Sequence, residues 1–290
     1  MVVQHNLRAM NSNRMLGLTN ASQSKSTEKL SSGYKINRAA DDAAGLSISE
    51  KMRRQIRGLS QASLNAQEGI SMVQAAEGAL TEVHDMLQRM SELSVKAETG
   101  TLTDVDRDYI NQEVEQLKTE IDRVAANTSF NEKKLLNGDL GVAKETVNVQ
   151  VDAEASKYIS FNIEAMDTTS LGIAAEADEV GALTYVDNDP TKDVNGGTGA
   201  AGLNWEVKQA LTKVSNQRSM LGAVQNRLEH TVNNLNNVVE NTTAAESQIR
   251  DTDMASEMVK YSNNTILAQA GQAMLAQSNQ ANQGVLALLQ

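Results

Sequence analysis

The chain has 290 residues and carries 37 acidic against 26 basic side chains, and its net charge of −11 argues against binding to nucleic-acid phosphates. Aromatic residues make up 3% of the sequence and proline occurs once, which argues against an all-β sandwich or barrel. Because there is no cysteine, disulfides, thiolate metal sites and cysteine nucleophiles are excluded.

Neither a membrane span nor a cleaved export signal is predicted. No segment has as many consecutive apolar residues as a spanning helix needs, which is about 18. Residues 1–16 lack the apolar core and the small-residue cleavage site of a secretory signal peptide. If the chain leaves the cell, we expect a route that reads something other than a cleaved peptide.

The first long helix is predicted over residues 46–97. Its apolar side chains recur every seventh residue, as in a coiled coil, and about 50 residues at ~1.5 Å each give a rod rather than a globule. With Met90 at heptad position d, Gln88, Arg89 and Glu92 fall at the exposed positions b, c and f. The residues that keep the period are Val73, Ala76, Leu80, Val83, Leu87, Met90, Ser94 and Ala97.

A second helix is predicted to begin after Thr103, because Asp106 follows three residues later as in a capping box. Its apolar stripe consists of Ile110, Val114, Leu117, Ile121 and Val124. A third long helix is predicted over residues 203–249. Its apolar side comprises Val207, Leu211, Val214, Leu221, Val224, Leu228, Leu235, Val238, Ala245 and Ile249.

Between the second and third helices the apolar period drops to two, which predicts a β-hairpin. The linker between its two strands is residues 152–157, and residues 167–202 are predicted to be a loop. The alternating apolar residues are Val147, Val149 and Val151 in one strand and Ile159, Phe161 and Ile163 in the other.

The fold class that follows is mainly α: a long antiparallel helical rod or coiled coil formed by the N- and C-terminal halves, with a small β-hairpin insertion. We expect residues 1–45 and 251–290 to form a terminal coiled-coil assembly region. Residues 46–175 and 203–250 would form the helical rod with its hairpin, and residues 176–202 a short variable linker.

The last 30 residues of the chain contain no charged side chain and are rich in Asn and Gln. Such a segment is either a low-complexity tail or a helix surrounded by other subunits, where a charge would be costly to desolvate. The second interpretation is favoured because the apolar repeat persists to the end of the sequence. The predicted polymerisation residues are Val3, Leu7, Met10, Leu18, Leu267, Met274, Val285, Leu286, Leu288 and Leu289.

No motif in the sequence predicts catalysis, and no cofactor or metal is expected. The glycines at 197, 199 and 202 match a dinucleotide-binding pattern, but a polar run containing Pro190 precedes them instead of a strand. The adjacent acids Asp41 and Asp42 are interpreted as caps or a solvated face. The three histidines are isolated in sequence, at His5, His84 and His230.

Four blocks and the ending VLALLQ resemble bacterial flagellin, in a short form without large outer domains. The resemblance implies a structural subunit of the flagellar filament, secreted to the cell exterior, that polymerises through its terminal helices and serves motility. By the same resemblance, the two chain ends are largely disordered in the free monomer and fold on assembly. The matching blocks are residues 29–49 (KLSSGYKINRAADDAAGLSIS), 58–83, 170–173 (SLGI) and 221–237.

The resemblance also implies partners. They are other copies of the chain, the flagellar type III export apparatus, an export chaperone on the C-terminal segment, and hook-junction and filament-cap proteins. A soluble signalling coiled-coil rod is the alternative function, although such a rod usually carries a membrane span or a charged tail.

Toll-like receptor 5 is a further partner that the resemblance implies. Two of its contact positions have alternative interpretations. Arg89 could form an ion pair with Asp85 one turn away, and Leu93 could pack in the core as an ordinary apolar residue. The implied receptor-binding residues are Leu87, Gln88, Arg89, Glu92, Leu93 and Glu113.

Overall fold

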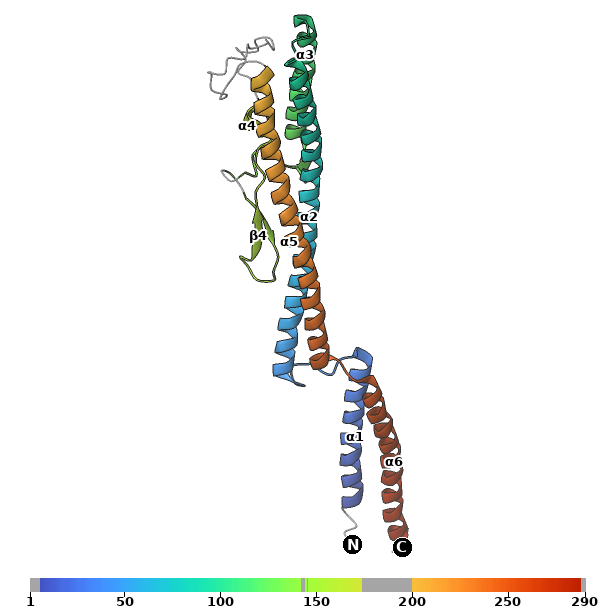
Figure 1. Cartoon of the computed structure of the whole chain (residues 1–290). Helices are drawn as coiled ribbons and strands as arrows, with labels where there is room; N and C mark the ends of the chain where they lie inside the picture. Colours follow the sequence, from blue (N-terminus) through green and yellow to red (C-terminus); the bar gives the residue numbers. More distant parts are fainter. Residues whose placement is uncertain (1–5, 142–143, 145, 174–199, 288–290) are drawn as a thin grey trace. The chain divides into compact units, whose positions relative to one another are not determined.

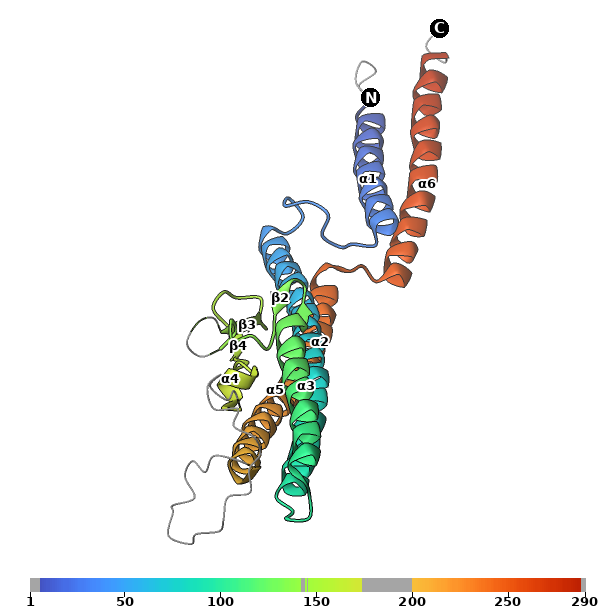
Figure 2. The same cartoon turned by 90° about the horizontal axis from the view of Figure 1, so that it is seen from above.

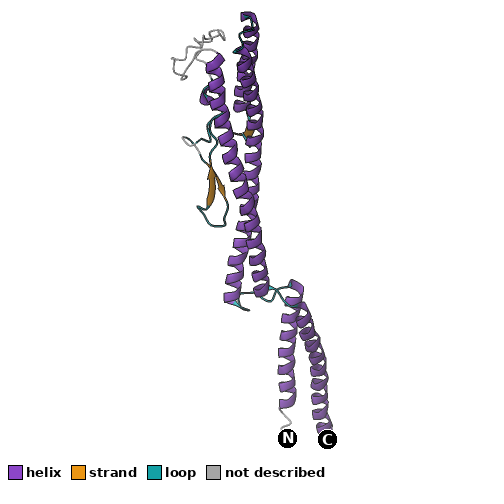
Figure 3. Cartoon of the chain, in the orientation of Figure 1, coloured by secondary structure: helices purple, strands orange, loops and turns teal. Residues whose placement is uncertain are grey.

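The computed structural model describes residues 6–141, 144, 146–173 and 200–287, and most of these are helical (Figures 1 and 3). The helices are α1 (Leu7–Ser32), α2 (Ala43–Ala97), α3 (Asp104–Asn127), α4 (Thr168–Leu171), α5 (Ala200–Arg250) and α6 (Met254–Ala287). The strands are β1 (Ser129–Phe130), β2 (Lys133–Lys134), β3 (Val147–Gln150) and β4 (Tyr158–Phe161). The predicted mainly helical fold with a small β-insertion is therefore confirmed.

The chain forms two compact units. The terminal unit comprises Met1–Arg57 and Val239–Gln290, and the central unit comprises Gly58–Val238. Helices α2 and α5 contribute residues to both units. The terminal unit thus reaches further along these two helices than the terminal region expected from the sequence, which ended at residue 45 and began again at residue 251.

In the central unit, α2 and α5 run antiparallel. Ser63 donates to Asn236 at 3.2 Å, and further along α2 Glu77 lies 4.0 Å from Arg218, so positions increase along one helix as they decrease along the other. The seven-residue apolar stripe of α2 faces the core and is fully buried. Its buried members are Val73, Ala76, Leu80, Val83, Leu87, Met90 and Ala97, and α5 adds Val207, Val214, Leu221, Val224, Leu228 and Leu235.

The predicted capping box opens α3. The Thr103 hydroxyl accepts from the backbone N–H of Asp106 at 3.3 Å, and the Asp106 carboxylate accepts from that of Thr103 at 3.0 Å. The hydrogen bond from the Thr103 hydroxyl holds the pKa of Asp106 below its usual range. The buried Arg107 donates to the carbonyls of Ala97 and Thr99, both at 3.3 Å, and so satisfies acceptors at the end of α2.

The predicted hairpin is present as β3 and β4, which pair antiparallel with Val149 opposite Ile159. Both side chains are buried in the core cluster that contains the α2 stripe. A second pairing, of β1 with β2, was not predicted from the sequence. Its two-residue turn places Asn131 and Glu132 at positive φ (47° and 66°); Asn is typical of such a position, whereas Glu is not, so the residue types predict the turn only in part.

The prediction of a loop over residues 167–202 is wrong at both ends, because α4 begins at Thr168 and α5 begins at Ala200. Helix α4 forms because Asp167 caps it at the N–H of Ser170 and because Asp122 of α3 accepts from both the N–H and the hydroxyl of Thr168. Residues 174–199, with two glycines of the dinucleotide-like pattern, lie outside the described residues.

In the terminal unit, α1 and α6 lie side by side (Figures 1 and 2) and run antiparallel. Near one end of the pair the Asn6 side chain donates to the carbonyl of Ser278 at 3.1 Å, and near the other the Ser26 hydroxyl donates to Glu257 at 2.6 Å. Within the part of the chain that the structure describes, no helix has the length and apolar character that crossing a membrane requires.

Candidate functional site

The α1–α6 pair buries very little of its own surface. Among its described side chains, those that are buried are Ser26 of α1 and Glu257 and Ala268 of α6. Small residues allow the close approach, since a Cβ added at Gly271 would lie 3.3 Å from the Leu16 side chain. The two helices are therefore paired without an apolar core of the size that the central unit has.

Most of the described large apolar side chains of this pair are instead exposed. The exposed set includes the predicted polymerisation residues Leu7, Met10, Leu18, Leu267 and Met274. Exposed apolar surface on this scale marks a surface that another molecule covers. The prediction missed further exposed members because their spacing departs from the stripe it followed; they are Met15, Met254, Met258, Val259 and Ile266.

The remaining predicted polymerisation residues cannot be placed in the same way. Val3, Leu288 and Leu289 lie outside the described residues. Val285 and Leu286 belong to α6, but their side chains are outside the described part as well.

A buried carboxylate joins the two terminal helices. Besides the hydroxyl of Ser26, Glu257 accepts from the Lys260 ammonium group at 3.4 Å. The Ser26 hydrogen bond is the main reason why the pKa of Glu257 lies below its usual value, and it outweighs the effect of burial, which raises the pKa. The carboxylate is thus held in its charged form between the helices.

The segment that follows α1 and the segment that precedes α6 contact each other around Arg250. Its guanidinium lies 4.6 Å from the centre of the Tyr34 ring and 3.1 Å from the Glu50 carboxylate. Backbone bonds join the same segments, from Lys35 N–H to the carbonyl of Arg250 at 2.6 Å and from Thr252 N–H to that of Gly33 at 2.9 Å. The prediction missed this contact, for which the only local signal is a basic residue in the last turn of a helix.

A second candidate surface lies in the central unit around Arg89. Its Nε donates to Glu113 of α3 at 2.9 Å and its Nη1 to Glu92 at 3.1 Å. These hydrogen bonds, first the one to Glu113, raise the pKa of Arg89 above its usual value. The alternative pairing of Arg89 with Asp85 is wrong, because α3 brings a better-placed carboxylate to the guanidinium.

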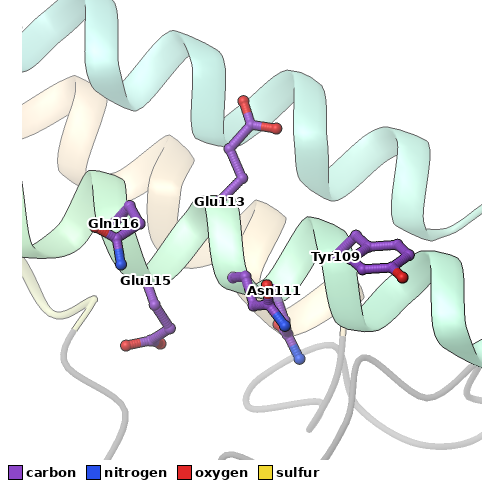
Figure 4. Close-up of a pocket in the computed structure, with 6 residues that line it drawn as sticks. Tyr109, Asn111, Glu113, Glu115 and Gln116 are labelled. Atoms are coloured by element: carbon purple, nitrogen blue, oxygen red, sulfur yellow. The ribbon is translucent and has the colours of Figure 1, made fainter.

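The heptad register correctly predicts which three of the predicted receptor-binding residues on α2 are exposed. Gln88, Arg89 and Glu92 are exposed, as is Glu113 on α3. Figure 4 shows Glu113 pointing toward the neighbouring helix α2, while Asn111 and Glu115 point the other way. Leu87 and Leu93 are instead buried in the core.

Beside Glu113, the partner of Arg89 on α3, this helix carries an open, shallow depression rather than an enclosed cavity. Its lining includes the exposed Tyr109 ring and is otherwise polar, formed by Asn111, Gln112, Glu113, Glu115 and Gln116 (Figure 4). Within the described ranges no group of three or more metal-ligating side chains comes together. Asp41 and Asp42 act as local caps, accepting from the N–H groups of Arg38 and Gly45 at 3.1 Å and 2.9 Å.

Comparison with known proteins agrees with this arrangement of two terminal helices and a helical centre. The family model for the bacterial flagellin N-terminal helical region matches residues 3–140, and that for the C-terminal helical region matches residues 206–289. The chain is 50% identical to flagellin of Bacillus subtilis and 47% identical to flagellin of Halalkalibacterium halodurans, with all of each chain covered. It is also 47% identical, over all of both chains, to a flagellar filament core protein of Treponema maltophilum. Long terminal helices that match the family at both ends of the sequence leave one conclusion: the chain belongs to the bacterial flagellins, the structural subunits of the flagellar filament.

Proposed function

We propose that this subunit enters the filament by burying the exposed apolar side chains of α1 and α6 against the same helices of neighbouring copies. The observation that carries the proposal is the contrast within the terminal unit between a nearly coreless helix pair and an outer surface rich in Leu, Met, Val and Ile. Burying one such side chain contributes about 1.5–3 kcal/mol. Repeated over many copies, this term would favour polymerisation.

The charge distribution supports the same proposal. Residues 261–290 carry no charged side chain, although the whole chain has a net charge of −11. A helix that stays in water gains solubility from charges on its outer face, whereas a helix enclosed by protein loses stability if it must desolvate them. The alternative function, a soluble signalling rod, does not account for this uncharged surface and is set aside by the membership of the chain in the flagellin family.

Removing residues 285–290 tests the proposed assembly. We expect the shortened chain to lose salt-induced polymerisation, followed by sedimentation and negative-stain microscopy, because the apolar end of α6 is gone. The central unit has its own core and should keep its thermal unfolding transition. Normal filaments from the shortened chain would contradict the proposal.

A charge placed on the exposed surface is a complementary test. Leu267→Glu should weaken polymerisation because a carboxylate would have to be desolvated in the filament. Tyr158→Glu is the matched control, since Tyr158 is exposed to a similar degree but lies on the hairpin of the central unit. Equal loss of polymerisation in both variants would show that added charge, and not its place on α6, is responsible.

We further propose that the exposed face of α2 and α3 around Arg89 binds Toll-like receptor 5. Gln88, Arg89, Glu92 and Glu113 would make the contact, and the two carboxylates at 2.9 Å and 3.1 Å would hold the guanidinium ready for it. Leu87 and Leu93 would support this face from the core, because both side chains are buried beneath it.

Arg89→Ala should weaken binding to the receptor ectodomain by at least about fivefold, a loss of roughly 1 kcal/mol or more, as expected for an arginine that contributes to the interface. Polymerisation should not change, because Arg89 belongs to the central unit. Arg123→Ala is the matched control, since Arg123 is an exposed arginine on α3 that is also paired with a glutamate, Glu120. Equal receptor affinity of the Arg89 variant and the unaltered chain in a binding titration would remove the assignment.

The remaining partners follow from the same exposed surface. Before assembly the apolar side of α6 needs a cover, and we propose that an export chaperone holds this segment inside the cell. We also propose that the subunit is exported through the flagellar type III apparatus. At the two filament ends it would contact hook-junction and filament-cap proteins.

A further inference from the structure

The described methionines differ in exposure between the two terminal helices and the rest of the chain. Every methionine of α1 and α6 is exposed, by between 47% and 64%: Met10, Met15, Met254, Met258 and Met274. Among the described methionines outside these two helices none is exposed: Met52, Met86 and Met220 are half-buried, and Met72, Met90 and Met166 are at 7%, 0% and 2%. Exposed thioethers thus occur on the surface through which we propose that the subunit assembles.

These side chains lie at both ends of the α1–α6 pair. The Asn6–Ser278 hydrogen bond and the contact of Leu16 with Gly271 bracket Met10 and Met274, which therefore lie at the same level of the pair. Met254 and Met258 are one turn apart at the start of α6, at the other end of the pair. A chemical change at methionine would alter the apolar surface near both ends.

We propose that these five methionines are a peroxide-sensitive modification site of the unassembled subunit, and that their conversion to sulfoxides blocks entry into the filament. The reaction needs only a peroxide. The thioether sulfur attacks one peroxide oxygen, the O–O bond breaks, an S–O bond forms and water leaves; the sulfur gives up two electrons and the peroxide takes them. Because the chain has no cysteine, no thiol competes for the oxidant.

The consequence for assembly follows from the polarity of the product. A sulfoxide is a strong hydrogen-bond acceptor on a side chain that was apolar, and burying it without a donor is costly. The inference rests on the proposed burial of α1 and α6 in the filament. It adds that the same burial protects the sulfurs, so that oxidation acts on the free subunit and not on finished filaments.

The test exposes the unaltered free subunit to hydrogen peroxide, quenches the reaction, maps the sulfoxides by peptide mass spectrometry and then measures seeded polymerisation by sedimentation. We expect the five terminal methionines to oxidise at least about tenfold faster than Met72, Met90 and Met166, because susceptibility follows exposure. The polymerised fraction should fall as their oxidation proceeds, and treatment with methionine sulfoxide reductases should restore it.

Two matched variants separate this site from other effects of peroxide. The variant with all five terminal methionines changed to Leu keeps the apolar surface and should polymerise equally with and without peroxide. The control variant with Met72, Met90 and Met166 changed to Leu should remain sensitive. If the five-Leu variant does not polymerise even without peroxide, the reductase experiment on the unaltered chain decides.

The inference is overturned if the oxidised subunit polymerises like the untreated one, if the five-Leu variant loses polymerisation on treatment, or if the reductases restore nothing. Treating preformed filaments with peroxide distinguishes a failure of the proposed function from a failure of this inference. If the five sulfurs oxidise as fast in filaments as in the free subunit, α1 and α6 are not buried on assembly, whatever the effect of oxidation.

Discussion

The hydrogen bond between Ser26 and Glu257 is a polar contact inside a helix pair with almost no interior. Its carboxylate is charged because the Ser26 hydroxyl and the Lys260 ammonium group compensate for its burial, with a smaller contribution from Lys29. A buried polar pair of this kind fixes the register of two helices more effectively than apolar contacts, which tolerate sliding. At the scale of single residues, we therefore expect Ser26 and Glu257 to contribute to the alignment of α1 with α6, together with the hydrogen bond between Gln23 and Thr265.

We predict that acid weakens the pairing of α1 with α6 through Glu257. Its pKa in the folded chain lies below the ordinary value of 4.5, so its contribution to stability is present above pH 4.5 and is lost as the pH falls through the folded pKa. Glu257→Gln should remove this dependence, and Glu257→Ala should cost about 1–3 kcal/mol because the Ser26 hydroxyl is left buried without an acceptor.

Amide hydrogen exchange in α1, corrected for the intrinsic effect of pH on exchange, measures the change. The control is Glu240→Gln, which removes an exposed carboxylate from the same unit and should leave the acid dependence unchanged. Identical acid dependence in the Glu257→Gln variant and the unaltered chain would refute the assignment.

At the scale of elements, the β3–β4 hairpin and its turn pack closely against two glycines of α2. A Cβ added at Gly58 would lie 2.6 Å from the Cβ of Ala153, in the hairpin turn, and one added at Gly69 would lie 3.1 Å from the Val149 side chain in β3. Glycine inside a helix destabilises it relative to alanine, so propensity does not account for these residues. These glycines are explained instead by the space that they leave for the hairpin.

Gly58→Ala should therefore destabilise the central unit by about 1–3 kcal/mol, since the new methyl group overlaps a neighbouring backbone that must move. Gly78→Ala is the matched control on the same helix: its Cβ would meet nothing within 4 Å. Removing that glycine should stabilise the chain by about 0.5–1 kcal/mol. Urea unfolding of both variants measures the two changes in the free energy of unfolding. A change of the same sign in both variants would contradict the proposed packing of the hairpin against Gly58.

At the scale of the whole molecule, the apolar core is unevenly distributed. The large cluster of buried apolar residues comes from the central unit, whereas α1 and α6 leave most of their described large apolar side chains exposed. Local opening is easiest where few apolar contacts must be broken. We therefore expect the central unit to be stable by itself and the terminal helices to gain their stability from assembly.

Amide hydrogen exchange on the free and polymerised protein should show this difference directly. In the free subunit we expect fast exchange in α1 and α6 and slow exchange in the buried parts of α2, α3 and α5. In the filament the terminal helices should slow by at least about a hundredfold while the centre changes little, a difference of roughly 2.7 kcal/mol in opening free energy. Equally slow exchange of the termini before assembly would contradict the prediction.

Local patterns in the sequence were sufficient for the long helices, the capping box and the β3–β4 hairpin. The seven-residue period, Thr103 with Asp106, and the alternation around Val149 and Ile159 each act over a few residues, so the residues themselves carry the signal. The uncharged end of the chain and the blocks that match flagellin likewise needed no structure to be recognised. Within a heptad register, even the exposure of Arg89 followed from its position.

Only the tertiary structure decided which distant groups meet. Glu113 and not Asp85 lies beside Arg89, Ala153 gives Gly58 its role, Asp122 holds the start of α4, and Arg250 joins segments more than 200 positions apart. The physical reason is that periodicity fixes the face of a helix on which a side chain lies. It does not fix the axial level at which another helix passes, which depends on packing of the whole core.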